Sequence, residues 1–215
     1  MGFPNVALGA NRNTGGAKNV IYIAEVSDFT TLGQIEPSPT TFATYANPAA
    51  LPATSTGAQV GDYSFTTSTK QFYKVVGSIG NHVKIYANLS IVEDHVLASG
   101  TMGTIEAQYR SPNSESNGSK EYQVTGFDES FKAKVAGNIE SNLGTLRDMV
   151  AKPLIVLVKD NDGNLIQFGE QSAPCYMLIE KEMLGTEANG FKGSEIMFSC
   201  HTKAFYRGAT GSLLP

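Results

Sequence analysis

Charge, cysteine and long apolar runs are all scarce in this sequence of 215 residues, and each shortage excludes a class of protein. Charged residues make up 17% of the chain, which argues against a protein dominated by surface helices. The net charge of −4 excludes a basic protein that holds duplex DNA by its phosphates. No apolar run reaches the roughly 18 residues that a membrane-spanning helix needs. The N-terminus has neither a basic nor an apolar segment, so we expect no secretory signal.

Cysteine and histidine are also too few and too scattered to predict a chemical site. Cys175 and Cys200 lie in apolar segments, and we expect both to be reduced core residues, with a disulfide between them as the alternative. The three histidines show no metal-ligand spacing. His201 follows Cys200, but adjacent strand residues point to opposite faces, which argues against a Cys–His pair. We therefore expect no catalytic, cofactor-binding or metal-ligating residue, and no enzyme.

Glycine is abundant, with 22 residues, and alternating segments predict about eight to ten strands with one helix. The longest predicted strand is Glu121–Ala136. Its apolar set shifts by one residue after Gly126, which predicts a β-bulge. A strand of this length would extend roughly 50 Å, beyond any compact body of this size, so something must cover the excess.

The segments on either side of this strand predict its neighbours. Thr104–Arg110 alternates cleanly and is expected to pair with the long strand, joined to it by a polar, flexible tip at Ser111–Ser119. After the strand, Asn138 is a candidate cap for a helix that Pro153 ends. The apolar stripe of this helix is expected to consist of Ile139, Leu143, Leu146 and Val150.

A tight hairpin is predicted next. Leu154–Val158 is an unbroken apolar run, typical of a strand buried on both faces. The turn Asp160–Gly163 and the return strand Leu165–Phe168 complete the hairpin. The same turn has some likeness to a calcium loop, but its glycine is at the fourth place and Gln171 stands where a glutamate is required. We therefore favour the hairpin.

The rest of the chain gives a first strand, an insertion and two late strands. Pro37–Thr56 has the composition of a long loop, and it precedes a small hairpin, so residues 46–80 are predicted to be an insertion. Residues 1–17 and 208–215 show no periodic pattern, and we expect them to form an N-terminal arm and a C-terminal arm. The predicted strands are Asn19–Val26 and His82–Ala87, both in the main sheet, Asp62–Phe65 and Gln71–Val76 in the small hairpin, and Cys175–Lys181 and Glu195–Phe205 near the C-terminus.

The small hairpin carries four aromatic residues, which are Tyr63, Phe65, Phe72 and Tyr73. We expect them to form the core of the hairpin. The alternative is a platform on which sugars stack, in a carbohydrate-binding or adhesin-type β-sandwich.

The order of the segments in residues 100–205 resembles the tail tube protein (major tail protein) family of tailed bacteriophages. In that family a helix, an apolar strand, an aspartate–glycine turn and a glycine-containing strand precede a closing pair of strands. The matching positions are Leu143–Val150, Leu154–Asp160, Gly163, Gly169 and the segment from Gly193 to Phe198. The opening strand Asn19–Val26 is similar to the family's first strand.

The resemblance implies a mainly β (α+β) fold in one domain over residues 1–215. The expected architecture is an antiparallel β-sandwich or barrel with one flanking helix and a long hairpin that oligomerises into a ring-shaped inner barrel. Hexameric rings would stack into a tube through which DNA passes. The implied partners are further copies of the chain and the tape-measure, tail-terminator and distal-tail proteins. No membrane or cofactor is implied, and the location is the virion tail, assembled in the host bacterial cytoplasm.

The resemblance also implies contact residues. The expected contacts between rings or subunits are Ser111, Pro112, Asn113, Ser114, Glu115, Ser116, Asn117, Gly118 and Ser119, together with the two arms. The candidate lumen face consists of Asp128, Ser130, Lys132 and Lys134. The two lysines fit a DNA-repelling lining poorly. A secretion-system or contractile-particle tube would share this architecture.

Overall fold

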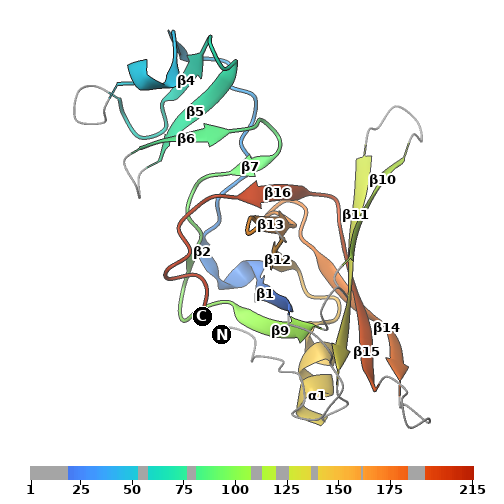
Figure 1. Ribbon diagram of the computed structural model, residues 1–215. Coiled ribbons are helices and arrows are strands. Elements are labelled where there is room, and N and C mark those ends of the chain that lie inside the picture. The colour runs from blue at the N-terminus through green and yellow to red at the C-terminus, as the bar shows by residue number, and fades with distance from the viewer. Residues whose placement is uncertain are drawn as a thin grey trace.

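Figure 1 shows the computed structural model, which describes residues 19–52, 58–76, 81–107, 113–119, 126–136, 140–160, 162–183 and 192–215. For residues 19, 81, 113–119 and 126–129 only the backbone is described. The described part is mostly β, with one helix and several sheets, none of which closes into a barrel. The prediction of a mainly β fold is therefore confirmed. The strands are more numerous and shorter than expected, from β1 to β16.

A six-stranded sheet forms the centre of the molecule, in the order β7, β16, β13, β12, β1, β9. All neighbours are antiparallel except β16 and β7. The strands are β1 (Asn19–Glu25), β7 (Ser90–Ile91), β9 (Gly103–Ala107), β12 (Leu154–Lys159), β13 (Leu165–Phe168) and β16 (Lys203–Tyr206). Strand β12 is covered on both faces, since its first four residues are fully buried. The apolar run predicted this position correctly.

The turn between β12 and β13 is held by the side chain of Asp160. Its Oδ1 accepts hydrogen bonds from the backbone N–H groups of Asp162 and Asn164 at 2.9 and 2.8 Å, and its Oδ2 accepts one from the Asn164 amide at 3.0 Å. These bonds, the one from the Asn164 side chain above all, lower the pKa of Asp160. Gly163 has a φ of +86°, which glycine adopts most readily. The carboxylate is thus engaged within the turn, and the predicted hairpin is confirmed.

A second sheet, of four antiparallel strands, packs against one face of the first in the order β10, β11, β15, β14. Its strands are β10 (Asn113–Ser119), β11 (Gly126–Ala136), β14 (Tyr176–Met183) and β15 (Gly193–Cys200). Strand β11 pairs with β10 from Gly126 to Lys132 and with β15 from Glu129 to Ala136. The β10–β11 hairpin extends beyond the six-stranded sheet (Figure 1).

Two predictions about this hairpin are wrong. The strand around Thr104–Arg110 does not pair with β11, because β9 pairs with β1 at one end of the six-stranded sheet. Ser111–Ser119 is not a flexible tip, because Asn113–Ser119 forms β10. Alternation identifies a half-buried strand but does not specify its partner. An edge strand held by backbone hydrogen bonds also needs no apolar residues, so its sequence gave little signal.

The predicted bulge at Gly126 is not seen in the described part of β11. The register of β11 is regular with both neighbours, and residues 121–125 lie outside the described part. In this sheet the pairing shifts instead between Ile179 and Lys181 in β14.

The chain crosses from one sheet to the other at His201–Thr202. The predicted strand Glu195–Phe205 is in fact two strands, β15 in the four-stranded sheet and β16 in the six-stranded sheet. The sequence pattern continues through the crossing, although the buried residues of β15 belong to the core between the sheets, whereas Ala204 and Tyr206 of β16 belong to a second core. Cys200 is buried and His201 is exposed, so the two side chains do not form a pair.

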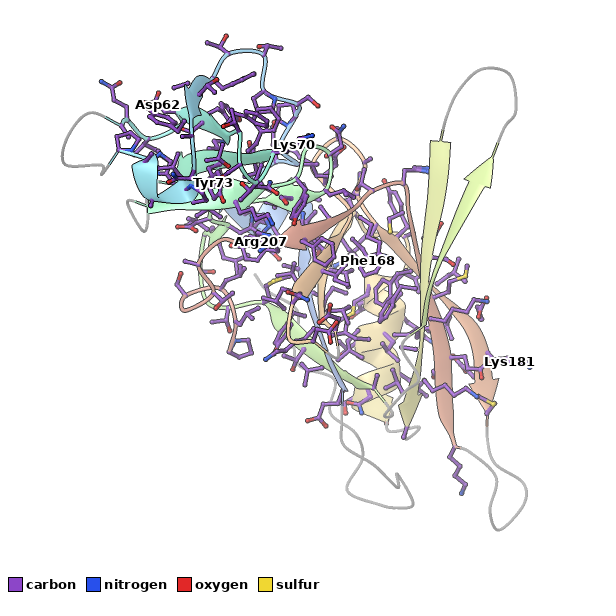
Figure 2. The ribbon with its side chains drawn as sticks, turned by 45° about the horizontal axis from the view of Figure 1, so that its top comes forward. Asp62, Lys70, Tyr73, Phe168, Lys181 and Arg207 are labelled. Atoms are coloured by element: carbon purple, nitrogen blue, oxygen red, sulfur yellow. The ribbon has the colours of Figure 1, made fainter. Side chains whose placement is uncertain are left out.

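The main core lies between the two sheets. Aromatic rings join them: the Phe131 ring of β11 lies 5.4 Å from that of Phe168 and 5.8 Å from that of Phe198. Figure 2 shows Phe168 between the sheets. A second core covers the other face of the six-stranded sheet and includes Leu157 and Leu213. Residues 208–215 are therefore packed on the body, with Leu213 1% exposed, and the prediction that they form an arm is wrong.

The single described α-helix, α1 (Glu140–Met149), confirms the predicted position but not the predicted stripe. Asn142, Leu146 and Met149 are buried, whereas Leu143 is half-buried and Val150 is 39% exposed. The stripe was misplaced because the helix ends at Met149, with a positive φ at Ala151. Asn138 and Ile139 lie outside the described part. No described helix is long and apolar enough to cross a membrane.

A third unit is a small sheet of four strands at one end of the molecule (Figure 1). Its strands are β3 (Ala43–Tyr45), β4 (Tyr63–Thr66), β5 (Gln71–Val76) and β6 (Asn81–Ile85), and a short helix η2 (Pro48–Ala50) precedes β4. The prediction that His82–Ala87 belongs to the main sheet is wrong, because β6 pairs with β5. A two-stranded ribbon of β2 (Phe29–Thr31) and β8 (Val96–Leu97) completes the described strands.

A buried charge cluster joins the small sheet to the body. Lys74 of β5 lies 2.8 Å from Glu36 and 3.0 Å from Glu93, and the Tyr63 hydroxyl donates a 2.7 Å hydrogen bond to Glu36. Burial alone would lower the pKa of Lys74, but the two carboxylates more than reverse this and raise it. The small sheet is thus fastened by a satisfied ionic contact.

Candidate interaction surface on the four-stranded sheet

The four-stranded sheet has one covered face and one outward face, as the alternation in β11 predicts. Phe131, Ala133 and Val135 are buried in the main core. Lys132 and Lys134 lie between them on the opposite side, with 48% and 47% of their side chains exposed. We call this side of β11, β15 and β14 the outward face.

The lysines of the outward face are paired with glutamates of neighbouring strands. Lys132 Nζ lies 2.9 Å from Glu180 Oε1 of β14, and Lys134 Nζ lies 2.9 Å from Glu195 Oε1 of β15. The hydrogen bond from Lys134 lowers the pKa of Glu195, and the charges of Lys134, Lys181 and Lys132 add to this effect. The positive charge that argued against a DNA-repelling lining is therefore neutralised in place.

Apolar side chains lie beside these ion pairs, towards β14. Tyr176 and Leu178 of β14 are 47% and 39% exposed. Leu178 is paired in register with Met197, which is half-buried. Val150 is also 39% exposed, but it is bridged to the buried Met177 and so does not share the side of Tyr176 and Leu178. We call Tyr176, Leu178 and Met197 the apolar strip. Exposed apolar side chains that gather in one place are typical of a surface that another molecule covers.

Strands β10 and β14 stand at the two ends of the four-stranded sheet. The start of β14 is bonded to the body, since Cys175 exchanges backbone hydrogen bonds with Leu154 and the Met177 carbonyl accepts one from Ala151. Beyond Met177, the strand that the described part pairs with β14 is β15. An edge strand with an apolar margin is a template for pairing with a further strand.

The structure brings only some of the predicted contact residues to a surface that it describes. Ser111 and Pro112 lie outside the described part. Asn113–Ser119 forms the edge strand β10, not a tip, and its backbone pairs with Gly126–Lys132. Among the candidate lumen residues, Ser130 is half-buried, and Lys132 and Lys134 are exposed on the outward face. Asp128 lies opposite Asn117 in register, and its side chain is not described.

Glu180 and Glu195, which pair with the lysines, were not predicted from the sequence, and neither was the apolar strip. One signal was available. The segment Tyr176–Ile179 is apolar on both faces of its strand, although a strand with one solvated face should alternate. Such a segment is typical of a strand with both faces covered.

In the described part of the chain, no group of three or more His, Cys, Asp or Glu residues could hold a metal ion. Cys175 and Cys200 are both buried and form no disulfide, as expected. Burial, and then the neighbouring Cys200 thiol, raise the pKa of Cys175 well above its usual value, so the Cys175 thiol is not poised as a nucleophile.

His95 is a satisfied core histidine. It is 2% exposed, its Nδ1 accepts a 3.0 Å hydrogen bond from the Gly33 backbone N–H, and its Nε2 lies 2.6 Å from Gln167 Oε1. Since Nδ1 is an acceptor, the proton of the neutral ring is on Nε2 and is donated to Gln167. Burial lowers the pKa of His95.

The four aromatic residues of the small sheet do not share one face. Phe65 and Phe72 are paired in register, with their rings 4.9 Å apart, and Tyr63 lies on the same side and bonds to Glu36. Tyr73 is paired with Ser64 on the opposite side. The arrangement favours the expected hairpin core over a platform of four rings on which a sugar could stack.

Comparison of the chain with protein-family models, with curated proteins and with solved structures finds no match.

Proposed function

We propose that the chain is a structural protein that assembles into rings and, through stacked rings, into a tube of the phage-tail type. The observation that carries the proposal is the form of the four-stranded sheet. Its two ends are the edge strands β10 and β14, and its β10–β11 hairpin extends past the body (Figure 1). The sheet thus has two different edges. The β10 edge projects past the body, where a neighbouring copy could pair with it.

Pairing β10 of one copy with β14 of the next would continue the sheet around a ring. Such an interface is heterologous, because two different surfaces meet, and it forms a closed ring when the rotation between copies closes. Closure removes the free edges that would otherwise promote aggregation. In the ring the neighbouring copy would pair with the long hairpin along β10. On the other side it would contact Tyr176 and Leu178 at the β14 edge of the outward face, so that the part of the face around β11 and β15 stays open.

The location and partners follow from the resemblance and belong to the same proposal. The tube would lie in a virion tail, be assembled in the host bacterial cytoplasm, and contact tape-measure, tail-terminator and distal-tail proteins. DNA would pass through without sequence-specific binding. The acidic balance of the chain supports this, because a net charge of −4 disfavours retention of phosphates.

Electron microscopy of the purified chain tests the proposal directly. We expect rings or tubes about 100 Å wide, the width of six such bodies around a channel. A protein that stays monomeric at every concentration tested would refute the proposal.

A substitution in the apolar strip tests the interface. In Leu178→Asp we expect the monomer to fold but rings to be lost, because a carboxylate would be placed among apolar groups that the neighbour covers. Light scattering after size-exclusion chromatography measures this loss. The matched control is Leu89→Asp: Leu89 is 51% exposed but lies between β6 and β7, away from the strip. Equal assembly by both variants would contradict this interface.

A further inference from the structure

We propose that Glu180 and Glu195 keep the outward face of the four-stranded sheet from binding nucleic acid by neutralising a group of three lysines on it. The inference deepens the proposed function, on which its biological purpose rests, since a face that lines a DNA channel must not hold DNA. The masking itself is a property of the single chain, and it can be measured whether or not rings form.

Two of the three lysines lie in one row across the strands, and the third lies next to that row. Lys134, Glu195 and Lys181 are paired in register across β11, β15 and β14, so that one carboxylate lies between two lysines. Figure 2 shows Lys181 directed away from the body of the molecule. Lys132 lies two residues before Lys134 on the same side and is bound by Glu180 at 2.9 Å. Opposite charges at directly facing positions of a sheet attract, and like charges repel.

The net charge of this row and of Lys132 depends on the two glutamates. A lysine contributes to DNA affinity when it replaces the counterions of a phosphate, and a lysine already held by a carboxylate has less to offer. Without the carboxylates of Glu180 and Glu195, the surface around Lys132, Lys134 and Lys181 would lose two negative charges and become more positive on an otherwise acidic chain. In a ring, this surface would repeat in every copy.

The test is DNA binding by the Glu180→Gln/Glu195→Gln variant of the full chain, which keeps the size of both side chains and removes their charge. The probe is a fluorescent duplex of random sequence, followed by anisotropy. For the natural chain we expect no salt-sensitive binding. For the variant we expect binding at about 50 mM salt that weakens at least tenfold by about 200 mM, the signature of phosphate contacts.

The matched control adds Lys132→Gln and Lys134→Gln to that variant and should abolish the binding. Circular dichroism and thermal melting check folding, and the single variant Glu195→Gln is judged by the same criterion if the double variant does not fold. Binding by the natural chain as tight as by the variant, or none by a folded variant at low salt, would overturn the proposal. Electron microscopy of the same samples separates the two ideas: missing rings refute the tube, and missing DNA binding refutes the masking.

Discussion

At the scale of single residues, His95 shows how the fold fixes the charge state of a side chain. The ring is enclosed between Gly33 and Gln167, and Gln167 is itself bonded to the Gly169 carbonyl at 2.9 Å. A second proton would have to sit on Nδ1, facing the N–H group of Gly33. The folded protein therefore resists protonation of His95, which the unfolded chain accepts freely.

The stability of the protein should consequently fall in mild acid. The pKa of His95 is lowered on folding, so its contribution is complete above the unfolded value of about 6.5 and is lost as the pH falls towards the folded value. We expect the free energy of unfolding in urea to decrease between about pH 6.5 and pH 5, and less steeply in His95→Gln. The pKa of His82 is also lowered by burial, so part of the slope should remain. The exposed His201 gives the control, and a His201→Gln variant that flattens the slope equally would contradict this account.

Two glycines should respond to alanine in opposite ways. Gly169 has a φ of +85°, and a Cβ there would lie 2.7 Å from the Cys175 nitrogen and 3.0 Å from the Leu154 oxygen. Gly144 is in α1, and a Cβ there would meet no atom within 4 Å. We expect Gly169→Ala to cost about 1–3 kcal/mol and Gly144→Ala to gain about 0.5–1 kcal/mol. Urea midpoints measure both, and a loss of stability in Gly144→Ala would show that the helix position is misjudged.

At the scale of elements, the charge cluster at Lys74 determines how the small sheet is held. The Lys74 and Glu36 side chains are 10% and 2% exposed, so neither charge can be left alone at low cost. Lys74→Met would leave Glu36 buried with Tyr63 as its side-chain partner.

We expect Lys74→Met to lower the free energy of unfolding by about 3–5 kcal/mol, as when one partner of a buried ion pair is removed. Adding Glu36→Gln should recover a large part of this loss, because the remaining partner then carries no charge and still accepts the Tyr63 hydrogen bond. Urea denaturation of the single and double variants measures the coupling. Additive losses would show that the pair is not coupled.

Elements with local signals were predicted from the sequence, and elements defined by distant partners were not. The β12–β13 hairpin was predicted because Asp160 and Gly163 specify its turn within a few residues. The alternation of β9 was recognised, but its partner is β1, which is far away in the sequence. Strand β10 gave no signal because it is polar. The lysines of the candidate lumen face were predicted from β11 alone, whereas their glutamate partners come from β14 and β15.

At the scale of the whole molecule, three units carry different parts of the proposed role. The six-stranded sheet with its two cores gives stability, the four-stranded sheet provides the margins and the outward face for assembly, and the small sheet is fastened at one end. In the proposed tube, assembly and DNA passage would depend on one sheet, so that changes in the small sheet should alter stability without preventing ring formation.

The crossing at His201–Thr202 also places a condition on the timing of folding during synthesis. Strands β15 and β16 are both interior strands, the first between β11 and β14 and the second between β13 and β7, yet they follow every other described strand in the chain. A nascent chain that ends at Met183 therefore has a gap in each sheet. The ribosome must release Gly193–Cys200 before the gap in the four-stranded sheet can close, and Lys203–Tyr206 before the gap in the six-stranded sheet can close. The two sheets are therefore completed one after the other, by segments that only two residues separate.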